Sequence, residues 1–98
     1  MSHREEKILT LHPEGKAGVN ISRSKYDQVR RFITEQLKQN GLMTYKDLSY
    51  TASILLSPEF DGSVSWYLVT VKLDLEARGI LERVNSKNGH IIKLKTRK

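Results

Sequence analysis

Leu73-Asp-Leu-Glu-Ala-Arg-Gly-Ile-Leu-Glu-Arg83 is the stretch of this 98-residue sequence that decides the fold. Leucines at helical spacing run up to Gly79, and the apolar pair Ile80 and Leu81 follows the glycine directly. Glycine readily adopts the left-handed conformation that ends a helix, and a short apolar run is typical of a strand. The stretch therefore predicts a helix that passes into a strand across a single residue.

The helix before this junction is predicted to begin at Ser63, a residue type that caps helix N-termini, and to carry residues 66–78. At about 100° per residue, its apolar side chains form two stripes on opposite sides. The first stripe is Val64, Leu68, Val71 and Leu75, and the second is Trp66, Val69, Leu73 and Ala77. A helix with two apolar stripes needs cover on both sides. A second copy of the protein or the N-terminal arm could cover the second stripe, the arm through Leu9, Leu11, Val19 and Ile21.

Two further helices are predicted upstream. The first spans residues 24–40, where apolar residues recur at intervals of three and four. Ser24 with Asp27 resembles a capping box, and Asn40-Gly41 supplies a left-handed stop. The helix should bury Tyr26, Val29, Phe32, Ile33 and Leu37.

The second of these helices is predicted from Tyr45 to about Ser57, where Pro58 ends it. Thr44 with Asp47 gives the start signal, and Met43 can pack against Leu48. Its core face is expected to hold Leu48, Ala52, Leu55 and Leu56.

Residues after Gly79 predict two strands, 80–84 and 90–95, joined by the loop 85–89. The Asn88-Gly89 pair in that loop is a strong signal for a hairpin. At the other end of the chain, residues 1–21 form an arm with two short apolar patches around a turn-rich segment. We expect this arm to pack on a single domain that spans residues 22–98.

Three helices followed by a hairpin, with a single glycine before the first strand, is the order of an α+β winged helix-turn-helix. The stretch 73–83 resembles the helix-glycine-strand junction of winged-helix transcription regulators. That resemblance implies a β-hairpin wing and raises the expectation of DNA binding, but fold alone does not establish function.

A narrower resemblance rests on three motifs: Gly15-Lys-x-Gly18, Gly62-Ser-Val-x-Trp-Tyr67 and Val71-Lys-Leu-Asp-Leu-Glu-Ala-Arg-Gly79. Together with Tyr26, these motifs resemble a family of small uncharacterised bacterial proteins. The likeness covers residues from about 12 to 95 and implies no known activity.

Composition excludes several kinds of site. The chain has no cysteine, so disulfides and thiolate chemistry are absent. Its histidines, His3, His12 and His90, lack the spacing of metal ligands, and residues 15–18 lack the Ser or Thr of a phosphate loop. No apolar run approaches the roughly 18 residues of a membrane span. We expect a cytoplasmic, non-enzymatic protein with no metal, cofactor, membrane or small-molecule substrate.

The formal net charge of +6 is concentrated in residues 21–41 and 80–98. Two basic clusters are typical of proteins that bind polyanions, although solvated helix faces and charged edge strands also carry such residues. The cations at 93, 95 and 97 would share one face of a strand. The expected phosphate contacts are Arg30, Arg31, Lys87, Lys93, Lys95 and Arg97.

The third helix would read the DNA groove in such a protein. Its flank nearest the groove is predicted to be Ser63, Tyr67, Thr70, Asp74 and Arg78. This flank is poor in side chains that match base edges, and Asp74 would repel phosphate. The leading hypothesis is a regulator-like module that binds double-stranded DNA through the wing and the first helix. The alternative is a protein-interaction or homodimerising module with the third helix buried and no nucleic-acid binding. A solvent-open polar face on that helix would favour the first.

Overall fold

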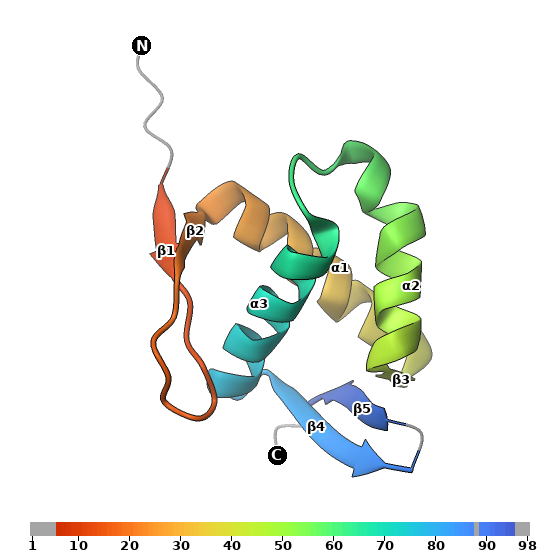
Figure 1. Cartoon of the computed structure of the whole chain (residues 1–98). Helices are drawn as coiled ribbons and strands as arrows, with labels where there is room; N and C mark the ends of the chain where they lie inside the picture. The colour runs from red at the N-terminus through yellow and green to blue at the C-terminus, as the bar shows by residue number, and fades with distance from the viewer. Residues whose placement is uncertain (1–5, 88, 96–98) are drawn as a thin grey trace.

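A computed structural model describes residues 6–87 and 89–95 as an α+β fold with three helices and two small antiparallel sheets (Figure 1). The arm holds β1 (Lys7–Leu9) and β2 (Asn20–Ser22). It is followed by α1 (Arg23–Asn40), β3 (Leu42–Thr44), α2 (Tyr45–Leu55), the 3-10 turn η1 (Ser57–Glu59) and α3 (Val64–Ala77). The last elements are β4 (Leu81–Ser86) and β5 (Gly89–Leu94).

α1 begins one residue before the predicted start, and its N-cap is not the predicted one. The Ser22 side chain accepts a hydrogen bond from the Lys25 amide, whereas the Ser24 hydroxyl bonds to the hydroxyl of Ser22. The capping-box assignment to Ser24 was wrong because β2 delivers Ser22 directly to the first turn. At the other end, Gly41 has a φ of 81° and donates its N–H to Leu37, as the Asn-Gly stop predicts.

α2 starts as predicted, because the Thr44 hydroxyl accepts the Asp47 N–H at 3.1 Å. It ends at Leu55, and Pro58 lies within η1. Leu48, Ala52 and Leu56 are buried in an i, i+4 series, but Leu55 is 60% exposed. Placing Leu55 in the core was wrong, since neighbouring helical residues point about 100° apart and Leu56 takes the inward position.

α3 and its exit match the junction predicted from the sequence. The Ser63 hydroxyl caps the helix by accepting the Trp66 N–H at 3.3 Å, and Gly79 ends it with a φ of 79°. Ile80 then donates its N–H to Leu75, and Leu81 begins β4. The first apolar stripe of α3 is buried through Leu68, Val71 and Leu75.

The three-stranded sheet has the order β3-β5-β4. β4 and β5 pair antiparallel from Leu81 opposite Leu94 to Ser86 opposite Gly89, so that only residues 87 and 88 lie between them. The predicted five-residue loop was therefore too long. β3 was not predicted from the sequence, because a strand of three residues is too short to show a period.

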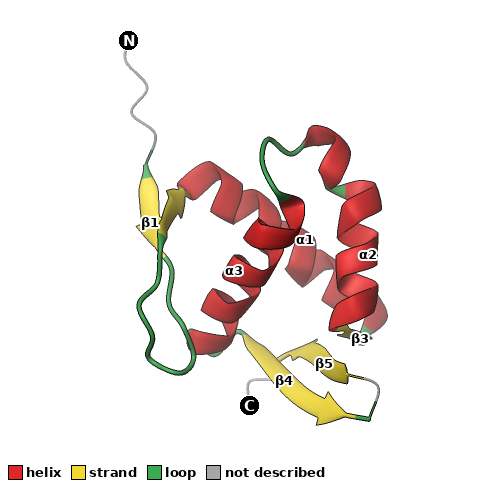
Figure 2. Ribbon diagram, viewed as in Figure 1, coloured by secondary structure: helices red, strands yellow, loops and turns green. Residues whose placement is uncertain are grey.

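The core lies among the three helices and the inner face of this sheet. Its fully buried side chains include Val29 and Ile33 from α1, Leu48 from α2, Leu75 from α3 and Ile92 from β5. Figure 2 shows the two sheets at separate edges of the helical layer.

The arm folds back on itself and packs against α1. Thr10 is buried and exchanges hydrogen bonds with Val19, and a Cβ on Gly18 would lie only 1.6 Å from the Thr10 carbonyl oxygen. Only glycine fits this approach. β2 crosses the predicted boundary at residue 21, and the division into arm and domain stays a prediction.

We expect Thr44→Ala to lower the free energy of unfolding by about 1 kcal/mol, because the substitution removes the hydroxyl that caps α2. Urea unfolding measures the change, and Lys46→Ala, at an exposed position in the same helix, serves as the control. Equal stability of Thr44→Ala and the wild type would show that the cap does not contribute.

We expect Gly18→Ala to destabilise the protein by about 1–3 kcal/mol, because the new methyl group forces the two sides of the arm apart at Thr10. Leu11 and Val19 lie next to these residues and line the same depression as Trp66, so Trp66 emission should shift to longer wavelength. Gly15→Ala is the matched control, since nothing lies within 4 Å of a Cβ there. Its positive φ costs about 1 kcal/mol, but it should leave the emission unchanged. Identical emission of both variants would contradict the close approach.

Candidate functional site

The second stripe of α3 is only partly covered. Trp66 is 45% exposed and Val69 37% exposed, and the half-exposed arm residues Leu11 and Val19 lie beside them. A depression of about 160 Å³ lies between the arm and α3, lined among others by Leu11, Val19, Trp66 and Leu73. We call Leu11, Val19, Trp66, Val69 and Leu73 the open face of α3. Of the four arm residues expected to cover this stripe, only Ile21 is buried.

On the side of α3 that was predicted to face the groove, Asp74 points into the interior of the protein. Asp74 is fully buried, and its carboxylate accepts hydrogen bonds from the Tyr26 hydroxyl, from the Leu11 amide at 2.8 Å and from Arg78 Nε at 2.8 Å. Asp74 thus joins α1, α3 and the arm. Its expected position on a groove-facing flank was wrong, because the arm and α1 enclose it.

This network acts on the phenol of Tyr26. Burial and the hydrogen bond to the Asp74 carboxylate raise the pKa of Tyr26 to about 12. Arg78 and Arg30 oppose the shift, so both cations lie close to this network. Tyr26 therefore stays protonated as a hydrogen-bond donor throughout the neutral range.

The other residues predicted to face the groove also have partners within the chain. Ser63 caps α3, and Tyr67 packs edge-on against Phe60 with ring centroids 5.0 Å apart. Thr70 lines the depression beside the arm. Arg78 is bound to Asp74, and its NH2 group lies 3.5 Å from the Leu9 carbonyl oxygen. These four residues do not form one solvent-open polar face.

A second buried polar cluster lies between α3, α2 and β5. Lys72 is 2% exposed and pairs with Glu76 at 2.6 Å, and its ammonium lies 5.5 Å from the centre of the Tyr45 ring. The His90 ring stacks on the Tyr45 ring, with the ring centroids 5.3 Å apart. Burial, Lys72 and Arg83 lower the pKa of His90, so its imidazole is neutral at neutral pH. The cluster is a packed contact between elements.

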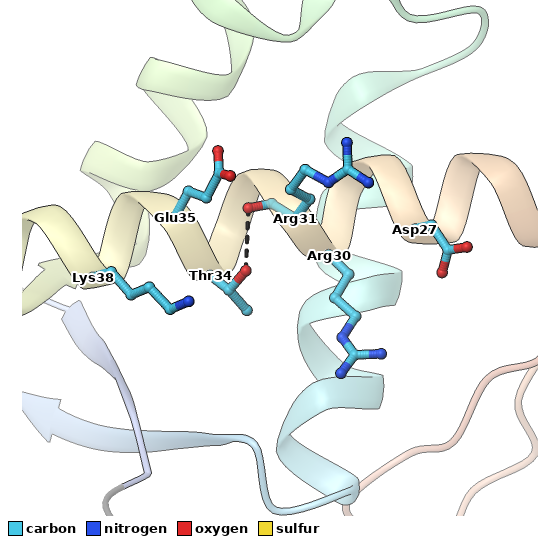
Figure 3. Close-up of a pocket in the computed structure, with 6 residues that line it drawn as sticks. All are labelled: Asp27, Arg30, Arg31, Thr34, Glu35 and Lys38. Atoms are coloured by element: carbon cyan, nitrogen blue, oxygen red, sulfur yellow. Dashed lines mark hydrogen bonds between the residues drawn. The ribbon is translucent and has the colours of Figure 1, made fainter.

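The outer face of α1 carries a group of three cations. Figure 3 shows Arg30 and Lys38 extending from one side of α1 with Thr34 between them, and Arg31 extending from the opposite edge. These residues, with Asp27 and Glu35, line a shallow depression of about 330 Å³. The Thr34 hydroxyl donates to the Arg31 carbonyl at 3.2 Å, and Asp27 forms an ion pair with Arg23.

Two other cations lie near this face. Arg78 lies two residues before Ile80, and the Ile80 carbonyl accepts the Lys95 N–H at 2.9 Å. Arg30 and Arg78 both lie close enough to Tyr26 to oppose the rise in its pKa. β5 contacts α1, and Lys95, which follows β5 directly, is held beside the exit of α3 by its backbone bond to Ile80. We call Arg30, Thr34, Lys38 and Lys95 the basic surface.

The remaining predicted phosphate contacts lie farther away. Lys87 is exposed beyond the far end of β4, about 20 Å along the strand at roughly 3.3 Å per residue. Lys93 shares its face of β5 with residue 95 and lies 3.9 Å from Glu82. Arg97 lies outside the described residues. Lys38 belongs to the basic segment 21–41, but it was not among the predicted phosphate contacts.

Ion pairs divide the cations of the chain into two groups. Pairs within the described residues hold Lys16, Arg23, Lys25, Lys72, Arg78 and Lys93. The described cations without an ion pair are Lys7, Arg30, Arg31, Lys38, Lys46, Arg83, Lys87 and Lys95. Three of these unpaired cations lie on α1, whereas both cations at α3, Lys72 and Arg78, are paired.

The described residues contain no group of three or more His, Asp or Glu side chains that could hold a metal ion. None of the helices described is long and apolar enough to cross a membrane.

Stability should fall in alkaline solution through Tyr26. Its pKa is raised above the ordinary value of 10, so the unfolded state loses this proton first, and stability that is complete below pH 10 is lost as the pH rises toward 12. In urea unfolding from pH 9 to about 12, Tyr26→Phe should show a shallower loss than the wild type. The exposed Tyr50→Phe variant is the control, and a wild-type slope in Tyr26→Phe would refute the assignment.

A family model matches residues 7–91 of the chain and is described as a family of unknown function (DUF6958). No match was found to a curated protein or to a solved structure. The match covers every helix and almost all of the basic surface, with Lys95 just beyond it. The chain belongs to the DUF6958 family of unknown function.

Proposed function

We propose that this chain is a winged-helix module without a catalytic centre, and that its basic surface binds the phosphates of double-stranded DNA. The order of elements supports the fold: three helices, a short strand between the first two, and a pair of antiparallel strands after the third. In this proposal β4, β5 and the residues between them are the wing.

The single observation that carries the binding proposal is the distribution of unpaired cations. Arg30, Lys38 and Lys95 form no ion pair within the described residues. Arg30 and Lys38 extend from one side of α1 (Figure 3), and Lys95 follows β5, which contacts α1. A cation that keeps its charge available can displace counterions from a phosphate, which is the main source of sequence-independent affinity for DNA.

The dimensions of this surface fit a duplex. Arg30 and Lys38 are eight residues apart on α1, which is about 12 Å at 1.5 Å per residue. That separation is close to the roughly 12 Å width of the major groove, so the two side chains can reach phosphates on both of its edges.

Base reading by α3 is not part of this proposal. Asp74 and Thr70 face the arm, Arg78 is bound to a carboxylate, and the most exposed positions of the second stripe are apolar. We therefore expect phosphate contacts that position the protein without selecting a sequence.

A second candidate function is favoured by the open face of α3. Half-exposed tryptophan and valine side chains beside an apolar depression are typical of protein interaction surfaces. Such an interaction could replace DNA binding, and the following experiment separates the two.

We expect the protein to bind two labelled duplexes of unrelated sequence with similar affinity in fluorescence anisotropy. The affinity should fall steeply between about 50 and 200 mM salt. Arg30→Ala, Lys38→Ala and Lys95→Ala should each reduce the slope of log affinity against log salt by about 0.9, because each removes one phosphate contact.

Lys16→Ala is the matched control, since Lys16 is an exposed cation that pairs with Glu14 on the arm, and its salt slope should equal that of the wild type. No binding of wild-type protein at about 50 mM salt would reject the proposal and leave the interaction module as the function. Equal slopes for all four variants would reject the basic surface as the contact.

A further inference from the structure

We infer that the open face of α3 binds a second copy of this chain, so that the protein forms a symmetric dimer. This inference goes beyond the proposed DNA binding and names the partner for the second candidate function, which uses the same face. It starts from the side chains that the fold leaves uncovered.

The open face combines an aromatic anchor with an apolar surround. Trp66 packs edge-on against Tyr67, with ring centroids 4.9 Å apart, yet nearly half of its surface remains exposed. Val69 follows one turn later on the same stripe, and Leu11 and Val19 from the arm complete the apolar surface. Tryptophan at the centre of an apolar surface is the residue type that contributes most to protein interfaces.

Charge around this face distinguishes a second copy from an acidic partner. On the arm, Glu14 pairs with Lys16 at 3.2 Å, and Lys25, whose ammonium lies 5.4 Å from the centre of the Tyr67 ring, lies 4.0 Å from Asp61. The two charged neighbours of Leu73 in the sequence, Lys72 and Asp74, are buried and pair with Glu76 and Arg78.

A chain with a net charge of +6 repels its own copies over most of its surface. The border of the open face is neutral, so two copies can approach there without that repulsion. A surface meant for an acidic partner would instead keep unpaired cations at its border, as α1 does. The neutral apolar face therefore fits a self-complementary interface, in which the same patch from both subunits meets across a two-fold axis.

The dimer would leave the basic surface free. α1 packs against the first stripe of α3, and the open face is on the opposite stripe. In Figure 1, α1 crosses behind α3. Each subunit could then present its own cations to one duplex.

Sedimentation velocity in high salt without DNA tests the inference. The wild type should change from monomer to dimer with rising concentration, below about 1 mM, and the emission of Trp66, the sole tryptophan, should shift to shorter wavelength in parallel. Val69→Glu should remain monomeric, with a dissociation constant raised at least about tenfold, because dimerisation would bury an unpaired charge.

Ile54→Glu is the matched control, since Ile54 is a half-exposed apolar residue on α2 outside the open face, and this variant should dimerise like the wild type. Circular dichroism confirms that each variant is folded. If Val69→Glu does not fold, the concentration dependence of wild-type Trp66 emission decides.

A wild type that remains monomeric to about 1 mM, or a dimer that Val69→Glu leaves intact, overturns the inference. Dimerisation should be insensitive to salt, whereas DNA binding should weaken as salt rises. The two proposals can therefore fail separately.

Discussion

The carboxylate of Asp74 is the group on which the arrangement of arm and helices depends. It is fully buried, and its hydrogen-bond donors come from α1, from the arm and from the end of α3 itself. A buried carboxylate without these donors would cost several kcal/mol, so each of the three elements is held where it can supply its own donor. The apolar core could tolerate small shifts between these elements, but the geometry of these hydrogen bonds could not.

Local signals in the sequence predicted most of the fold. Caps at Thr44 and Ser63 and the stops at Gly41 and Gly79 depend on residues within one turn, and all four are present. The errors concern long-range contacts. β3 exists because it pairs with β5, about fifty residues later, and Ser22 rather than Ser24 caps α1 because β1 positions β2.

The candidate site was predicted less well for the same physical reason. Arg30 and Lys95 were recognised as cations, but the sequence could not show that the Lys95 backbone bonds to Ile80, just after α3, or that Arg30 and Arg78 both act on Tyr26, because these neighbourhoods depend on tertiary contacts. Asp74 was interpreted as an exposed charge, since its partner Leu11 is 63 residues away and contributes only a backbone amide. Which cations are paired and which are not also depends on tertiary contacts, and this distinction separates the basic surface from the neutral open face.

The direct join between β2 and α1 limits how such a chain can vary. Ser22 is both the last residue of the strand and the N-cap of the helix, so no linker absorbs a change in length. One residue inserted there would rotate the arm by about 100° around the axis of α1 and take Leu11 away from Asp74. Insertions between residues 12 and 17 would only lengthen an exposed loop. Length variation in the family should therefore be found in that loop and not at residue 22.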